Sequence, residues 1–287
     1  MKKEIEITVP NYIDEFQVYL KKKNQSEHTI IAYQISIRYF YVLYQTITIA
    51  NLKAYRSFLI TNYRPATINQ RIHAMNVYLQ FLEAHHQDHC PDLQSYRLRS
   101  IKIPRGSYQD SIISNEDCTL LQEKLREEGQ DFWYFVVRFL VTTGARVSEL
   151  VQIKVEHLRC GYLDLYSKGG KIRRIYITDT LCAEAQEWCR SRGLKSGFLF
   201  VTKSGNPVTA RGIQTQLNTF AIRYGIDPNT VYPHSFRHRF AKNFLERCGD
   251  IALLADLMGH ESIETTRIYL TKSSKEQQEL LDELVTW

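Results

Sequence analysis

Long hydrophobic runs are absent from this sequence of 287 residues. No segment approaches the roughly 18 uninterrupted apolar residues that a membrane-spanning helix needs. The first residues, MKKEIEITVPNYIDEF, are acidic where a secretory signal would be apolar. Hydrophobic residues make up 44% of the chain and charged residues 24%, values typical of folded globular proteins. We therefore expect a folded cytoplasmic protein without a membrane partner.

Motifs for metal, disulfide or nucleotide chemistry are also lacking. The six cysteines form no Cys-x-x-Cys pair, which indicates reduced, packed thiols. No P-loop and no paired carboxylate cluster occurs, which argues against a metal-dependent nuclease, a polymerase or an ATPase. His85, His86, His89 and Cys90 have ligand chemistry for zinc, but no second pair completes a site, and solvated imidazoles at a helix end explain them better. We expect no metal and no cofactor.

The length and the distribution of charge predict two domains. A chain of 287 residues exceeds one ordinary compact core. Residues 1–106 hold 14 Lys and Arg against 8 Asp and Glu, whereas the rest of the chain is balanced at 23 against 23. The basic excess at the N-terminal end suits a sequence-independent contact with phosphates, although a solvated basic surface is the alternative.

The hydrophobic pattern predicts a mainly α protein with a small antiparallel β-sheet in its second domain, an α+β class. Residues 11–86 read as amphipathic helices, with Ser26 and Thr67 as expected caps. We expect a helical domain at 1–100, a linker at 101–108 and a second domain at 109–287, which ends in a helical tail at 273–287. Segments 161–167 and 171–177 flank a glycine turn and predict a hairpin, and 197–201 predicts a third strand.

Four short segments of the second domain carry side chains suited to phosphate chemistry. Arg146 follows the glycine that ends an apolar helix, and Lys168 lies at the tip of the expected hairpin, with Lys171 as its rival. His234 and Arg237 are three residues apart and so share one face of a first helical turn, where the helix dipole favours an anion. The fourth segment, LMGHESIETTRIYL, contains His260 and Tyr269.

Together these side chains meet the needs of metal-free attack on a phosphodiester. Positive and hydrogen-donating groups can stabilise a pentacovalent transition state. One group can take the proton of a tyrosine nucleophile, and another can supply a proton to the leaving oxygen. Each segment alone has a common structural explanation, because exposed arginines, turn lysines and packed tyrosines are frequent. Their combination favours a catalytic role in attack on a phosphodiester.

The motifs TTGARVSELVQI, YSKGGKIRRIYI, PHSFRHRFAKNFLE and LMGHESIETTRIYL resemble those of the tyrosine recombinases, the phage integrase family, and within it the compact bacterial Xer-like members. SEHTIIAYQ and ATINQRIHAMNVYLQFL are similar to the family's core-binding domain. The resemblance implies that Arg146 and Arg237 clamp the scissile phosphate, that Lys168 protonates the 5′-hydroxyl and that His234 handles the proton of Tyr269. It implies that His260 donates a hydrogen bond to the phosphate and that Tyr269 forms a 3′-phosphotyrosine.

The same resemblance implies the partners: double-stranded DNA with a recombination site, a tetramer of this chain on that DNA, strand exchange through a Holliday junction, and a paralogous recombinase or accessory protein as a further possibility. Glu149 is expected to support the site. Arg239 and Lys242 depart from the family pattern and are candidates for phosphate contacts, with solvent exposure as the alternative; Arg71 is a third candidate. The alternative functions are a type IB topoisomerase-like enzyme, which relaxes DNA without strand exchange, and a non-catalytic DNA-binding architectural protein.

Overall fold

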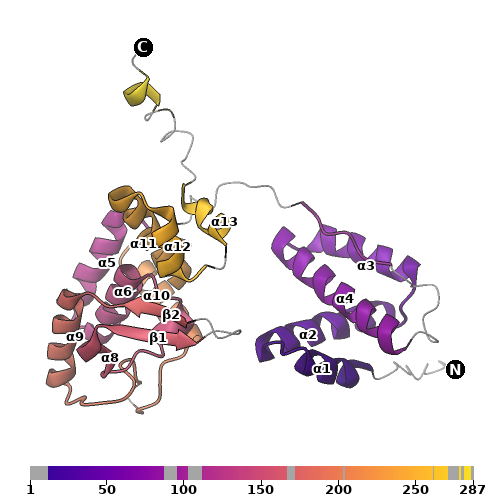
Figure 1. The fold of residues 1–287 in the computed structure, drawn as a ribbon, viewed down its shortest axis with the longest axis horizontal. Coiled ribbons are helices and arrows are strands. Elements are labelled where there is room, and N and C mark those ends of the chain that lie inside the picture. The colour runs from indigo at the N-terminus through magenta and orange to yellow at the C-terminus, as the bar shows by residue number, and fades with distance from the viewer. Residues whose placement is uncertain are drawn as a thin grey trace. The chain divides into compact units, whose positions relative to one another are not determined.

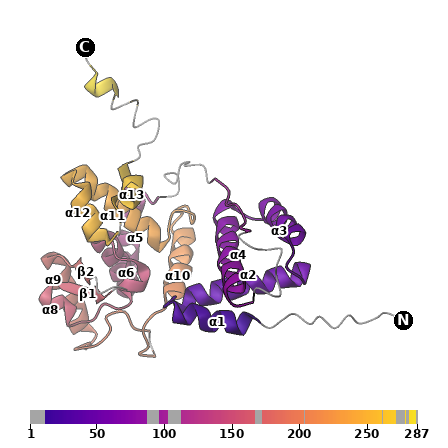
Figure 2. The same ribbon diagram turned by 45° about the vertical axis from the view of Figure 1, so that its right-hand side comes forward.

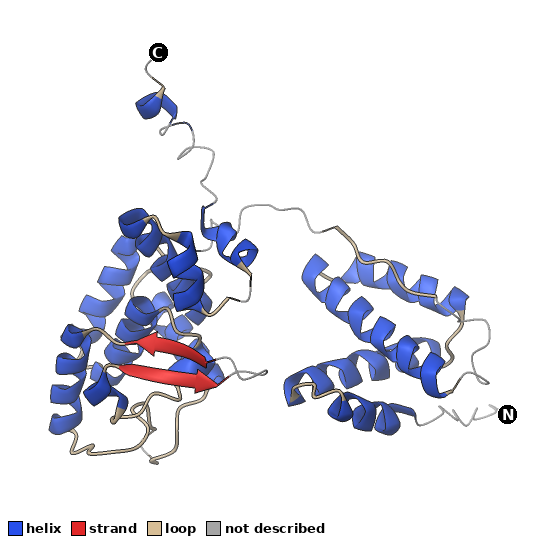
Figure 3. Ribbon diagram, viewed as in Figure 1, coloured by secondary structure: helices blue, strands red, loops and turns tan. Residues whose placement is uncertain are grey.

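The chain divides between Gly106 and Ser107 into two units, and each is described by itself. The structure is a computed structural model that describes residues 12–86, 96–102, 112–166, 172–202, 204–260, 262–270, 278 and 281–285. Within these residues the protein is mainly helical with one two-stranded antiparallel sheet, so the predicted fold class is confirmed (Figures 1 and 3). None of the helices in these ranges combines the length and the apolar character needed to cross a membrane.

In its described residues, the first unit is a bundle of helices α1 (Tyr12–Lys22), α2 (Glu27–Tyr44), α3 (Ile49–Asn62) and α4 (Pro65–His85) (Figure 2). Helix α4 contacts the other three. The core of this bundle is strongly aromatic, since it buries Phe16, Phe40, Tyr55, Tyr78 and Phe81. Aromatic rings bury much apolar area each and prefer edge-to-face pairs, which lets so few helices close a core.

The ends of two of these helices test the expected caps. The hydroxyl of Ser26 accepts a hydrogen bond from the backbone N–H of Thr29 at 3.2 Å, so this cap is confirmed. The expected cap at Thr67 is wrong, because α4 begins two residues earlier at Pro65, with Arg64 as the capping residue. Proline suits the first helical position, where its fixed φ matches the helix and its missing N–H would have no partner.

The chain that leaves the first unit is fastened to α4 by two asparagines. The side-chain amide of Asn76 both donates to and accepts from the backbone of Leu98, at 2.9 and 2.8 Å. Asn69 does the same with Ile101, at 2.9 Å each way. Seven residues of helix and three of extended chain both span about 10 Å, so the two amides match the two backbone positions. Ile101, the first residue of the linker expected at 101–108, is therefore held by the first unit.

The second unit is built around helix α6 (Asp131–Thr143), which contacts α5 (Asn115–Glu127), α7 (Val147–Leu150), α9 (Asp179–Ser191) and α11 (Pro233–Cys248). This unit also contains α8 (His157–Cys160), α10 (Ala210–Arg223), α12 (Ile251–Met258), α13 (Ile263–Thr266) and the 3-10 turn η4 (Arg267–Leu270). Apolar side chains cover several sides of α6, as expected of a central helix.

The sheet consists of β1 (Tyr162–Tyr166) and β2 (Ile172–Tyr176), paired antiparallel with Leu163 opposite Ile175. The predicted hairpin strands are thereby confirmed (Figure 3). The predicted third strand at 197–201 is wrong. Phe198 and Val201 form only isolated bridges, to Lys154 and to Pro207, because their partners lie in loops and proline cannot donate to a ladder.

Helix α6 ends at Gly144, and this glycine is required for two reasons. Its φ of +60° lies in the left-handed region, which costs other residues about 1–2 kcal/mol. A Cβ there would also lie 2.4 Å from the Phe240 ring of α11. This close approach lets Arg146, two residues later, face α11.

We predict that Gly144→Ala lowers the free energy of unfolding by about 2–5 kcal/mol, the sum of backbone strain and overpacking. Gly193→Ala is the matched control, because φ is +66° but nothing lies within 4 Å of the added Cβ. It should cost only the strain, about 1–2 kcal/mol. Chemical denaturation of both variants checks this, and equal losses would contradict the packing argument.

Candidate active site

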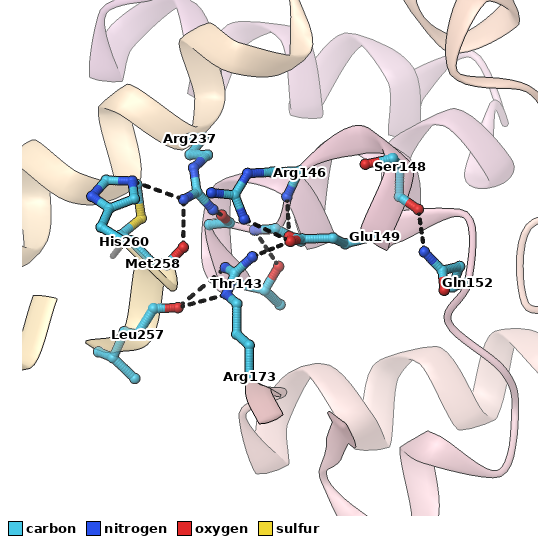
Figure 4. Close-up of polar contacts among 12 residues, drawn as sticks. Thr143, Arg146, Ser148, Glu149, Gln152, Arg173, Arg237, Leu257, Met258 and His260 are labelled. Atoms are coloured by element: carbon cyan, nitrogen blue, oxygen red, sulfur yellow. Dashed lines mark hydrogen bonds and ion pairs between the residues drawn. The ribbon is translucent and has the colours of Figure 1, made fainter. Parts of the chain in front are cut away.

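Arg146 and Glu149 form the first half of the candidate site (Figure 4). The backbone N–H of Arg146 donates to Glu149 Oε2 at 2.6 Å, and its guanidinium donates to Oε1 at 2.8 Å. Burial alone would raise the pKa of Glu149, but the charge of Arg173 and hydrogen bonds from Arg146 outweigh it and hold that pKa below its ordinary value. The carboxylate is thus ionised, while the Arg146 side chain remains 37% exposed and open to a ligand.

Arg237 forms the second half and is only 2% exposed. It projects from α11 between the C-terminal ends of helices α6 and α12, where it donates to the carbonyl of Gly144 and to that of Met258, both at 2.6 Å. A further contact joins its NH2 to His260 Nε2 at 3.1 Å. Burial and the neighbouring charges of Arg146 and Arg173 lower its pKa to about 10, so it stays charged at neutral pH. These three partners are all neutral.

The contacts of His260 define its protonation. A guanidinium cannot accept a hydrogen bond, so Nε2 accepts from Arg237, and Nδ1, 2.7 Å from Thr266 Oγ1, carries the proton. Burial and the charges of Arg237, Arg146 and Arg173 lower the pKa of His260 to about 4. In the free protein this ring therefore orients Arg237. The expected donation to phosphate requires that the ring gain a proton or shift one to Nε2.

Tyr269 lies in η4 beside these groups and is 9% exposed. Its ring meets that of His238 edge-on at 5.0 Å and lies nearly parallel to that of His260 at 6.2 Å. Burial raises the pKa of Tyr269, although the charge of Arg237 opposes the effect. The phenol is therefore protonated at neutral pH and needs a base to become a nucleophile.

His234 is the base that the family resemblance implies, and this role stays a prediction. It lies in the first turn of α11 with part of its side chain exposed to solvent, and its ring centroid lies 6.3 Å from that of His238. Partial burial and the charges of Arg237 and Arg146 lower the pKa of His234 below its ordinary value. The imidazole is accordingly neutral at pH 7 and free to accept a proton.

Five of the six expected catalytic residues, Arg146, His234, Arg237, His260 and Tyr269, fall within the described residues, and contacts or mutual charge effects link all five. Lys168 lies outside the described residues, as does its rival Lys171. Strands β1 and β2 are described up to Tyr166 and from Ile172, on either side of the turn. The role of Lys168 stays a prediction.

The three candidate DNA contacts have different surroundings. Arg239 donates through Nε to the carbonyl of Ile113 at 2.7 Å, so it fastens the chain before α5. The Arg71 guanidinium lies over the rings of Tyr39 and Tyr63, at 4.5 and 4.8 Å, and contributes to the core edge of the first unit. Lys242 is half-buried on α11. Phosphate contacts for all three stay predictions, and the contacts described for Arg71 and Arg239 are with the protein itself.

Two of the histidines considered for zinc, His85 and His86, have protein partners. The Nδ1 of His85 lies 3.0 Å from the carbonyl of Phe81. The Nε2 of His86 lies 3.1 Å from Glu15 Oε2, and its ring packs on Tyr12. His89 and Cys90 lie outside the described residues. Among the residues that the structure describes, no group of three or more His, Cys, Asp or Glu is placed to hold a metal ion.

Arg173 is the site residue that sequence reasoning missed. It lies on β2 opposite Leu165, on the sheet face that Ile175 also occupies, and it pairs with Glu149. The alternation of strand side chains carried a signal. With Ile175 and Ile177 facing the core, Arg173 must face inward too, and an inward arginine requires a buried acceptor.

The charges of this cluster do not balance. Arg146, Arg173 and Arg237 bring three positive charges, and Glu149 is the only carboxylate bonded to any of them in the described residues. Burying an excess of positive charge away from water costs free energy unless a counter-ion balances that charge. The arrangement is therefore suited to bind an anion next to a buried tyrosine.

Comparison with known proteins identifies the family of the chain. Residues 118–276 match the model of the phage integrase family. The chain belongs to this family. It is 28% identical over 291 residues to tyrosine recombinase XerA of Pyrococcus horikoshii, covering 98% of this chain and 96% of that protein. It is 26% identical over 288 residues to tyrosine recombinase XerD of Staphylococcus haemolyticus, covering 95% and 96%.

A solved structure shares the fold. The Tn1549 transposon integrase, in complex with transposon right end DNA, aligns with a TM-score of 0.70 over 96% of this chain and 99% of that one, at 14% identity. The resemblance drawn from the sequence motifs is confirmed, and so is the enzyme class, a tyrosine recombinase that breaks and rejoins DNA.

We predict that this recombinase loses stability when the pH falls from about 6.5 to about 4. Burial lowers the folded-state pKa of His238 and of His260 to about 4, whereas an unfolded histidine titrates near 6.5. The unfolded state therefore binds more protons across this window, and acid favours unfolding.

Thermal unfolding temperatures measured between pH 7 and pH 4 check this for the variant His238→Gln. The control is His28→Gln, because His28 lies in the first unit and not in the cluster of the second unit. The His238 variant should show a smaller acid-dependent fall. An unchanged pH dependence in that variant would contradict the burial argument.

Proposed function

We propose that this enzyme is a site-specific recombinase in which Tyr269 is the nucleophile. The observation that carries the proposal is the excess of positive charge around Arg146 and Arg237 beside the buried Tyr269 phenol. A scissile phosphate bound between the two guanidinium groups would supply the missing anion. Arginine suits this role because its planar fork matches phosphate oxygens.

The reaction proceeds through one exchange of bonds at phosphorus. The Tyr269 oxygen attacks, a Tyr–O–P bond forms, and the bond from phosphorus to the 5′ oxygen breaks, which leaves a 3′-phosphotyrosine. His234 accepts the phenol proton, and Lys168 donates a proton to the departing 5′ oxygen. Because the phosphodiester energy is retained in the covalent bond, attack by another 5′-hydroxyl rejoins the strand without ATP.

The bound phosphate also changes the protonation of His260. Its negative charge offsets the guanidinium charges that lower the pKa of this ring. The imidazole then gains a proton more readily and can donate from Nε2 to a phosphate oxygen. This reconciles the acceptor role in the free protein with the donor role that the family resemblance implies.

Strand exchange requires more than one copy of the chain. We propose a tetramer on two duplexes that passes through a Holliday junction, with the first unit as a second, basic contact to DNA. The C-terminal tail is a candidate for contacts between copies. Its described residues 281–285 include a short helical turn with exposed Leu281 and Leu284. A paralogous recombinase or accessory protein stays a possible partner, and a cytoplasmic location follows from a DNA substrate.

We predict that the purified enzyme forms a covalent adduct, stable in detergent, with nicked duplexes selected from a library of randomised core sequences. The nick lets the short cleaved strand diffuse away and traps the adduct. Tyr269→Phe should bind the selected duplex as well as wild type and form no adduct. Tyr224→Phe, at the end of α10, is the matched control and should react normally.

Absence of any wild-type adduct, or an adduct that persists in Tyr269→Phe, would contradict the proposal. An adduct that only religates to its own strand would favour a topoisomerase-like enzyme. DNA binding without an adduct would favour an architectural protein.

Lys168 is tested with a leaving group that needs no acid. We predict that Lys168→Ala slows adduct formation by about 10²–10⁴-fold, the usual contribution of general acid catalysis. Replacing the 5′-bridging oxygen with sulfur should restore the rate, because a thiolate leaves without a proton. Lys171→Ala is the control, and a wild-type rate for Lys168→Ala on the oxygen substrate would move the acid role to Lys171.

A further inference from the structure

Arg173 occupies an unusual place for a cation. Its side chain is only 10% exposed and projects from β2 into the candidate site (Figure 4). One terminal nitrogen pairs with Glu149 Oε1. Its Nε and other terminal nitrogen both donate to the carbonyl of Leu257, at 3.3 and 3.1 Å. All three guanidinium nitrogens therefore have partners in the protein.

The two partners of Arg173 lie on opposite halves of the anion site. Glu149 holds Arg146 by two hydrogen bonds. Leu257 directly precedes Met258, whose carbonyl accepts from Arg237, and His260 follows two residues later. One side chain thus joins the segment that places Arg146 to the segment that places Arg237 and His260.

The fit at the end of α12 is close. Gly259 ends this helix with a φ of +61°, and a Cβ there would lie 2.2 Å from Arg173 Cδ. Arg173 therefore packs against backbone that carries no side chain. Arg173 and Arg146 share the single carboxylate of Glu149, so the three guanidinium groups keep an excess of positive charge that a bound anion can balance.

We propose that Arg173 is a positioning residue that sets the separation of Arg146 from Arg237 and His260, and that it does not itself bind the scissile phosphate. This inference rests on the proposed function of the site. A guanidinium that is held by partners on both sides suits this role, because a misplacement of about 1 Å in an active site can cost about 10²-fold in rate. Lysine cannot replace it, since a single ammonium lacks the fixed fork that reaches both partners.

The test compares Arg173→Met with Arg174→Met on the selected nicked duplex. Arg174 is the neighbouring arginine on the exposed face of β2, where it pairs with Asp164. Arg173→Met should bind DNA as wild type does and form the adduct about 10- to 100-fold more slowly. Arg174→Met should react at close to the wild-type rate.

A second substrate separates positioning from general damage to the fold. It carries a methylphosphonate at the scissile position, in which a methyl group replaces one non-bridging oxygen and removes the negative charge. Misplaced guanidinium groups then matter less, so the deficit of Arg173→Met relative to wild type should shrink to within about 3-fold. Simple instability would give the same deficit on both substrates.

Arg173→Lys keeps the charge beside Glu149 and provides the readout should Arg173→Met fail to fold. It should show the same selective deficit on the charged phosphate. Equal deficits on both substrates, or a wild-type rate on the charged one, would overturn the inference. The proposed function fails separately, if wild type forms no Tyr269-dependent adduct with either substrate.

Discussion

The site depends on the ion pairs that the Glu149 carboxylate forms with Arg146 and Arg173. Glu149 accepts hydrogen bonds from the backbone and side chain of Arg146 and pairs with Arg173, and its side chain is nearly buried. Truncating one member of a buried ion pair commonly costs about 3–5 kcal/mol, because the other charge is left without compensation. Glu149 therefore holds two guanidinium groups in fixed positions and neutralises only one of them.

That incomplete neutralisation gives the site its chemistry. Arg237 has only neutral partners, and Arg146 keeps part of its guanidinium exposed. Burial and, after it, the same arginine charges lower the pKa values of His234 and His260, so both rings are neutral in the free protein. A neutral ring can accept the proton of Tyr269, and an arriving phosphate reverses the field at His260. In the proposed mechanism, this charge imbalance contributes to both anion binding and proton transfer.

The sequence predicted the features that local rules govern. The glycine after α6, the hairpin strands and the Ser26 cap follow from spacing and residue type alone, and the motifs placed Arg146, Arg237, His260 and Tyr269 in one site. Contacts between distant segments could not be predicted. The partners of Arg173 lie 24 residues before it and 84 after it, and Arg239 turns to Ile113, 126 residues away. The prediction of a third strand at 197–201 was wrong because the pattern of side chains in a strand does not show which strand is available to pair with it.

The most direct test of this account is a crystal structure of the enzyme bound to a selected duplex with an intact scissile phosphate. We predict that non-bridging oxygens of that phosphate accept hydrogen bonds from Arg146 and Arg237, with the Tyr269 oxygen facing the phosphorus. Arg173 should remain paired with Glu149 and Leu257. A scissile phosphate bound by Arg173, or one that contacts neither Arg146 nor Arg237, would contradict the account.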